Sequence, residues 1–127
     1  MDNNKKRPVY LNLFLLRLPV AGVVSILHRI SGVALVLFLP LALLALQRSL
    51  RSAADYQAVV DSLSLTPVRG LLLLLAAAFA QHFLAGIRHL LLDIDIGITR
   101  SQARLSAWLV LAGAAVATVW VGLRWLL

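Results

Sequence analysis

The chain has 127 residues, of which 61% are hydrophobic and only 13% are charged. Soluble domains are about half apolar and about a quarter charged, so a water-soluble globule of this length could not bury so much apolar surface. Three tracts contain no charged residue, and each is a membrane span or the body of one: residues 30–46, 70–80 and 105–123. The composition predicts an all-α membrane protein with three transmembrane helices.

The net charge of +7 does not indicate nucleic-acid binding, because the basic residues stand at the ends of the apolar runs and not on one solvated face. The absence of cysteine excludes a disulfide framework and thiolate metal sites, but histidine can still ligate haem iron. A signal peptide is not expected, because Arg17 and Pro19 interrupt the short apolar run after "KKRP". With nucleic-acid binding and cysteine chemistry excluded, the sequence points to a function within a membrane.

The first span is expected over about residues 20–46. Its uncharged tract, residues 30–46, is only about 25 Å long as a helix, shorter than the ~30 Å hydrocarbon layer. Arg29 can therefore lie at the membrane border while the helix continues outward. Pro40 is expected to kink this helix or to free a carbonyl group. A polar connection, "QRSLRSAADYQAVVDSLSLTP", follows.

The second span is expected over about residues 68–92 and the third over about residues 105–127, with Gly97 and Thr99 as stop and start signals between them. Three spans place the two ends of the chain on opposite sides of the membrane, and the side richer in basic residues is cytoplasmic. This rule predicts that residues 1–19 form a cytoplasmic tail. Eight basic residues lie on the N-terminal side and four on the other: Lys5, Lys6, Arg7, Arg17, Arg29, Arg88, Arg100 and Arg104 against Arg48, Arg51, Arg69 and Arg124.

Two polar stretches reach the same membrane border in this topology. In "SILHRISG", Ser25, His28, Arg29 and Gly32 are spaced i, i+3, i+4 and i+7, which places them on one helical face. A hydroxyl, an imidazole and a guanidinium group then converge beside a glycine. This face is the first candidate site.

The second stretch is "QHFLAGIRHLLLD", in which His82, Gly86, His89 and Asp93 form another helical stripe. His82 lies about 10 Å deeper in the membrane than His89, because seven residues separate them along the helix. His89 with Asp93 one turn later is typical of a local capping pair. Arg88 lies off the stripe, and snorkelling to the lipid headgroups explains it as well as a function does.

His82 is the least expected of these residues. It has no acidic residue within a turn and nothing to gain from snorkelling, so a neutral imidazole there requires a cross-helix hydrogen bond or a metal. The residues alone leave these two options open. His28 and His89 are expected nearer the surface, so a second axial ligand to a metal on His82 would come from a partner chain.

The stretches "RPVYLNLFLLRLPVAGVVSILHRISGVAL" and "HFLAGIRHLLLD" resemble the larger cytochrome b membrane-anchor subunit of succinate dehydrogenase, the succinate:quinone oxidoreductase of respiratory complex II. The resemblance covers most of the chain. It implies that residues 1–127 are a single membrane-anchor domain, part of a heterodimeric helical bundle that binds haem b together with a smaller anchor subunit.

The resemblance also implies roles for individual residues. His82 matches the axial ligand of the haem b iron, and His28 and Arg29 match residues near the haem propionates. Ser25 and Arg29 match residues that line the ubiquinone site. His89 and Asp93 match motif positions to which no firm chemical role is assigned.

The implied function is to pass electrons from an iron–sulfur subunit to ubiquinone in the bacterial cytoplasmic (inner) membrane. The chain has no flavin fingerprint and no cysteine, so FAD and the iron–sulfur clusters belong to partner subunits, and succinate is not oxidised on this chain. The anchor of a quinol:fumarate reductase is the alternative within this class. A small helical transporter or a cofactor-free assembly protein is the alternative outside it, although a transporter is expected to carry an acidic residue at mid-membrane.

Overall fold

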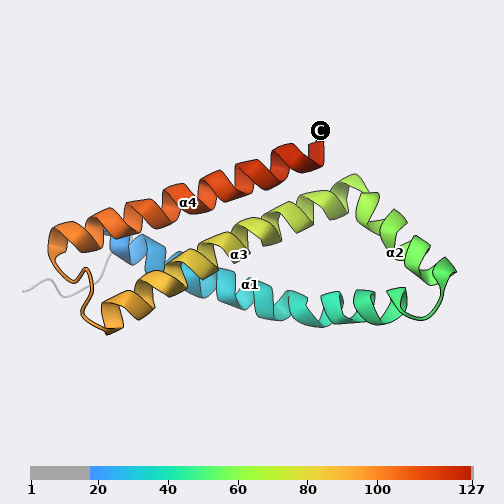
Figure 1. The fold of residues 1–127 in the computed structure, drawn as a ribbon, viewed down its shortest axis with the longest axis horizontal. Coiled ribbons are helices and arrows are strands. Elements are labelled where there is room, and N and C mark those ends of the chain that lie inside the picture. Colours follow the sequence, from blue (N-terminus) through green and yellow to red (C-terminus); the bar gives the residue numbers. More distant parts are fainter. Residues whose placement is uncertain (1–17, 127) are drawn as a thin grey trace, which may run out of the picture.

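In a computed structural model, residues 18–126 are described, and they form helices and short connections without any strand. The helices are α1 (Val20–Ser49), α2 (Ala53–Ser64), α3 (Thr66–Asp93) and α4 (Arg100–Leu126). Figure 1 shows α3 lying between α1 and α4, with α2 joining the far ends of α1 and α3. The tail expected over residues 1–19 lies almost entirely outside the described residues.

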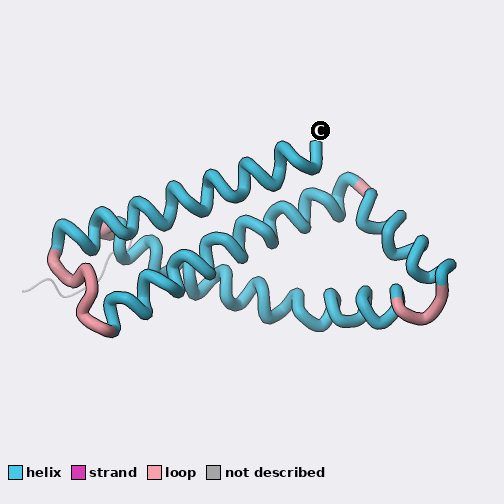
Figure 2. The backbone as a smooth tube through the Cα atoms, in the orientation of Figure 1, coloured by secondary structure: helices cyan, strands magenta, loops and turns pink. Residues whose placement is uncertain are grey.

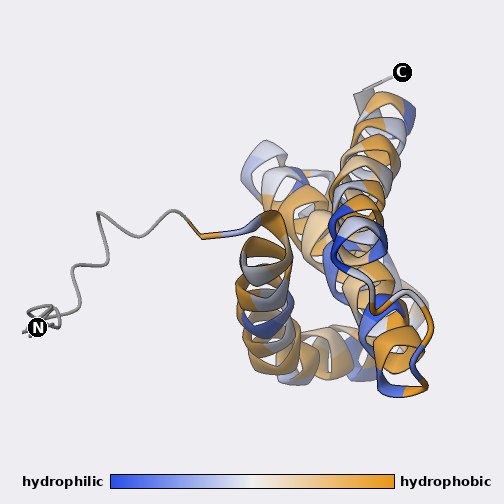
Figure 3. Ribbon diagram, turned by 90° about the vertical axis from the view of Figure 1, so that its left-hand side faces the viewer, coloured by the Kyte–Doolittle hydropathy of each residue, from blue (hydrophilic) through white to orange (hydrophobic). Residues whose placement is uncertain are grey.

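Three of these helices, α1, α3 and α4, are long and apolar enough to cross a membrane. Figure 3 shows apolar residues along the length of these helices, and most of the large apolar side chains on them are exposed. Helices that expose apolar side chains around their circumference are typical of membrane spans, where lipid or another helix covers them. The prediction of an all-α membrane protein with three transmembrane helices is confirmed.

A small core joins the three long helices near the N-terminal end of α1. It consists of Val24 from α1, Ala85 from α3, and Ala107 and Val110 from α4. Three of these four residues are fully buried. Small side chains at such a junction let helix backbones approach closely, which is how membrane helices pack without a strong hydrophobic drive.

The connection between α3 and α4 follows the expected signals. Gly97 adopts a positive φ of 80°, which glycine accepts without strain, and Thr99 Oγ1 accepts a hydrogen bond from the Gln102 amide at 3.4 Å. With this cap α4 begins at Arg100, five residues before the expected start of the third span. Arg100 and Arg104 therefore belong to the start of α4, which precedes its apolar stretch.

The polar connection expected after the first span contains helix α2 (Figure 2). Ser52 Oγ accepts a hydrogen bond from the Asp55 amide at 3.0 Å, and the Asp55 carboxylate accepts bonds from Ser52 Oγ at 3.0 Å and from Arg48 Nε at 3.4 Å. The spacing S-x-x-D is a helix-start signal. This signal was present in the sequence, although no helix was predicted for the connection.

Pro40 lies inside α1, which continues without interruption from Val20 to Ser49. The helix extends three residues beyond the expected end of the first span. Helix α3 starts at Thr66, two residues before the expected start of the second span. Pro67 fits its first turn, because the backbone N–H that proline lacks would have no partner within the helix there.

Candidate functional site

Three histidines meet where α1 packs against α3. The rings of His28 on α1 and His82 on α3 are stacked, with centroids 4.2 Å apart and planes 9° from parallel. His89, two turns after His82, also contacts His28, with the ring centroids 5.1 Å apart and the planes tilted by 57°. Within residues 18–126 no three histidine or acidic side chains are arranged to hold a metal ion by themselves. A metal at this histidine cluster therefore needs ligands from elsewhere.

The His82 ring is held by the backbone of α1. Its Nδ1 lies 3.0 Å from the carbonyl oxygen of His28 and 3.4 Å from Ser31 Oγ. Ser31 donates its own hydroxyl hydrogen to the same carbonyl at 2.9 Å. A carbonyl oxygen can only accept, so the bond requires a proton on Nδ1, and the neutral ring then carries its free lone pair on Nε2.

Each helix presents a glycine to the histidine of the other. A Cβ atom on Gly32 of α1 would lie only 2.8 Å from Cε1 of His82, closer than real Cβ contacts allow. A Cβ atom on Gly86 of α3 would lie 3.5 Å from Nε2 of His28, which is an ordinary contact. The two glycines thus leave room for the two stacked rings, and Gly32 does so with no space to spare.

The depth expected for His28 was wrong. It was placed nearer the surface than His82, but the two rings lie side by side. The reason is that α1 and α3 both extend well past the cluster: His28 is eight residues after the first residue of α1, and His82 is eleven residues before the last residue of α3.

Ser25 and Arg29, the other two members of the first candidate face, do not contact α3 through hydrogen bonds. Ser25 is half-buried and Arg29 is exposed, and neither side chain forms a hydrogen bond with another residue in the range 18–126. The expected face is therefore divided, because His28 and Gly32 pack against α3 whereas the Arg29 side chain is exposed.

Arg88 is the polar residue that sequence reasoning misjudged. It is only 6% exposed, and its Nε and Nη2 donate to Ser106 Oγ at 3.1 Å and to the Ala103 carbonyl at 3.2 Å, both on α4. Snorkelling is therefore excluded. The signal was its spacing from Gln81 and Ala85, since these three residues fall on the one buried face of α3.

Asp93 is the exposed last residue of α3, and the capping pair with His89 is absent. The ion pair found within the described residues joins Arg48 to Asp55, at the opposite end of the bundle. His89 instead contacts His28.

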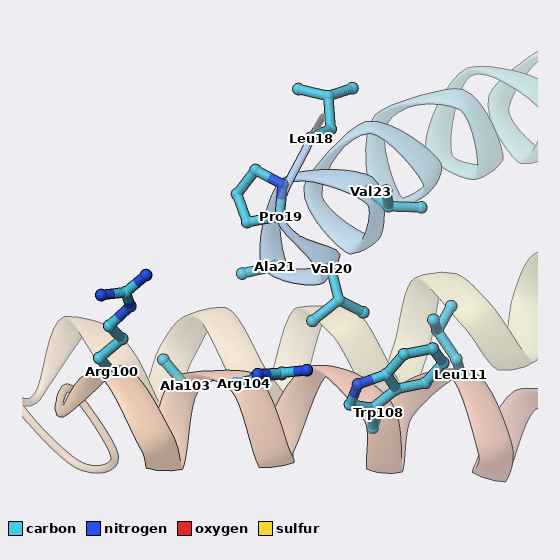
Figure 4. Close-up of a pocket in the computed structure, with 10 residues that line it drawn as sticks. All are labelled: Leu18, Pro19, Val20, Ala21, Val23, Arg100, Ala103, Arg104, Trp108 and Leu111. Carbon is cyan, nitrogen blue, oxygen red and sulfur yellow. The ribbon is translucent and has the colours of Figure 1, made fainter. Parts of the chain in front are cut away.

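A separate cavity of about 640 Å³ lies between the first turn of α1 and the start of α4. Figure 4 shows Arg100, Arg104 and Trp108 of α4 beside Val20 of α1 in its wall. None of the three histidines lines it. Arginine and tryptophan next to apolar walls are typical of a membrane border.

Comparison with known proteins adds to this geometry. Residues 3–121 match the family described as succinate dehydrogenase/fumarate reductase transmembrane subunit. The chain is 33% identical over 120 residues to the succinate dehydrogenase cytochrome b556 subunit of Coxiella burnetii, covering 94% of this chain and 96% of that protein. It is 34% identical over 119 residues to the subunit of the same name from Paracoccus denitrificans, covering 92% and 90%. The Rickettsia bellii subunit of that name is 31% identical over 118 residues, covering 91% and 92%.

The chain has three spans, a histidine cluster between two of them, and similarity to these proteins over nearly its whole length. It belongs to the succinate dehydrogenase/fumarate reductase transmembrane subunit family.

Proposed function

We propose that this chain is the haem b- and ubiquinone-binding anchor subunit of a succinate dehydrogenase. The observation that carries the proposal is the His82 imidazole, which lies inside a membrane helix with Nδ1 bonded to a backbone carbonyl at 3.0 Å and Nε2 left with its lone pair. The names of the relatives, succinate dehydrogenase cytochrome b556 subunit, support the same assignment.

His82 fits the role of axial haem ligand. Histidines that bind metals commonly donate their second ring N–H to a carbonyl or carboxylate, which fixes the tautomer and raises the basicity of the ligating nitrogen. When bound, the haem supplies a one-electron redox group within the membrane. The His28 ring is stacked face to face on that of His82, so His28 is not assigned as a second ligand of the same iron. That ligand is assigned to a smaller anchor subunit.

Arg29 and Ser25 are assigned to the quinone, and Arg29 with His28 to the haem propionates. The exposed Arg29 guanidinium has several donors, which suit a carboxylate or a carbonyl oxygen that gains negative charge on reduction. Ser25 lies one turn earlier on α1 and can donate to the same carbonyl oxygen. His28 contacts both α3 histidines, and its stacking on His82 covers one ring face, so a ring nitrogen at its edge is the group proposed to contact a propionate.

The remaining redox groups are assigned to partner subunits. FAD and the iron–sulfur clusters would lie in a flavoprotein and an iron–sulfur subunit on the cytoplasmic side, where the positive-inside rule predicts the N-terminus and eight of the twelve basic residues. The complex would lie in the bacterial inner membrane. A quinol:fumarate reductase is the second candidate, and the names of all three relatives favour succinate oxidation over it.

The reduced-minus-oxidised visible spectrum of the purified complex tests the haem assignment. We expect a b-type band that His82→Ala removes while the subunits remain assembled. His89→Ala is the matched control, because it removes an imidazole from the same helix and should keep the band. A His82→Ala complex that retains the wild-type band contradicts the assignment.

A further inference from the structure

We infer that α1 positions the imidazole of His82, with the His28 carbonyl, Ser31 and Gly32 acting on the haem through that ring and not by touching the haem. The inference rests on the proposed role of His82 as an axial ligand. It assigns to Ser31 and Gly32 a positioning role that their residue types alone do not suggest.

The first element of this device is the His28 carbonyl. It lies 3.0 Å from His82 Nδ1 and selects the tautomer in which Nε2 is free to bind iron. Rotating the ring by half a turn would place a carbon against this oxygen and leave the Nδ1 hydrogen without its acceptor. The cost of an unmade buried hydrogen bond opposes that rotation.

The second element is Ser31, which is buried at 6% exposure. Its hydroxyl group donates its hydrogen to the His28 carbonyl at 2.9 Å. Ser31 Oγ therefore has only lone pairs to offer His82 Nδ1, which lies 3.4 Å away. Two oxygen atoms of α1 therefore flank the same ring hydrogen. Burial of Ser31 keeps water from replacing either of them.

The third element is Gly32. It lies in the middle of α1 with no positive φ, so the need for glycine comes from space and not from backbone conformation. A Cβ atom there would meet Cε1 of His82 at 2.8 Å and Nδ1 at 3.2 Å. Any side chain would push this edge of the ring away from α1 and stretch the bond to the carbonyl. The parallel His28 ring at 4.2 Å covers the face of the imidazole and limits its tilt.

The hydrogen bond from Nδ1 gives the imidazole more electron density, which stabilises ferric over ferrous iron. Weakening it should therefore weaken haem retention and raise the midpoint potential. The test uses the assembled complex with Gly32→Ala, and it measures haem per complex, the low-spin electron paramagnetic resonance signal and the midpoint potential. We expect on the order of tenfold weaker haem retention, or a rise of ~59 mV for a tenfold loss of the ferric preference.

Gly70→Ala is the matched control, because it makes the same change in α3 at a glycine with nothing within 4 Å of the added carbon. It should leave all three readings at wild-type values. A Gly32→Ala complex whose haem content, resonance signal and potential all equal those of Gly70→Ala would overturn the inference.

If Gly32→Ala prevents assembly, Ser31→Ala tests the positioning of His82 instead, because this substitution removes one oxygen atom and adds no bulk. A rise in potential smaller than the ~59 mV above supports the inference, and an unchanged potential overturns it. Failure of the haem assignment is distinguishable from either result, because it appears as a wild-type complex without the band or a His82→Ala complex that keeps it.

Discussion

The two contacts that α3 makes differ in what they bury and what they leave open. Against α4 it buries Arg88 and packs small residues, and 22% of the most apolar stretch of α4 is buried. Against α1 it brings together imidazoles, glycines and a carbonyl, yet only 6% of the corresponding stretch of α1 is buried. The α3–α4 contact thus holds the chain together. The α1–α3 contact carries the candidate chemistry on the helix with the most surface left for other molecules.

Changes on α1 should therefore alter activity, and changes at the α3–α4 contact should alter stability. The largest effect is expected for Arg29→Leu on α1. Loss of a donor to a developing negative charge costs on the order of 100-fold in rate. Quinone reduction should fall by about that factor while succinate oxidation with a soluble acceptor is unchanged, because Arg29 is exposed and no described residue depends on it. Both activities are measured on the same purified complex.

Arg100→Leu is the control for this variant. It removes a positive charge at the start of α4, outside the proposed quinone site, and should leave both activities intact. An equal loss of both activities in Arg29→Leu would count against a quinone role and leave only a structural one.

The second effect is expected for Arg88→Met at the α3–α4 contact. The guanidinium donates to Ser106 Oγ and to the Ala103 carbonyl, and a hydrogen bond from a charged group contributes about 1.5–3 kcal/mol. Methionine keeps much of the volume but neither bond, so the free energy of unfolding in detergent should fall by about 3 kcal/mol, the lower end for two such bonds. The haem spectrum at low temperature should not change. If Arg88→Met instead shifts the haem spectrum and leaves the free energy of unfolding unchanged, the α3–α4 contact serves haem binding and not stability.

The spans and His82 could be predicted from the sequence, because uncharged tracts have a minimum length in a membrane and a solitary imidazole there has few explanations. The contacts of Ser31 and Arg88 could not. Both depend on how far each helix is rotated about its axis and where the helices cross, and residue spacing within one helix does not determine this. Gly32 was expected beside the polar groups of its own helical face, but which ring Gly32 and Gly86 each admit became clear only from the crossing of α1 and α3.

Helix α2 shows a different limit. Its cap, Ser52 with Asp55, was present in the sequence, but the segment was expected only to be a polar connection. The helix is mostly exposed and contributes no buried residue, so hydrophobic periodicity gave little indication of it. Local capping, and not burial, determines its start.

The smallest effect is expected for Gly86→Ala, which tests whether the two glycines of the α1–α3 contact are equivalent. The added carbon would lie 3.5 Å from Nε2 of His28, an ordinary contact, whereas the same change at Gly32 produces an overlap at 2.8 Å. Replacing a helical glycine by alanine where the space allows it adds about 0.4–1 kcal/mol of stability, because the unfolded chain loses freedom. Gly86→Ala should therefore retain wild-type haem content and unfold at slightly higher denaturant concentration. If it instead releases haem as readily as Gly32→Ala, general crowding of the contact governs haem binding, and the alignment of His82 by the α1 carbonyl does not.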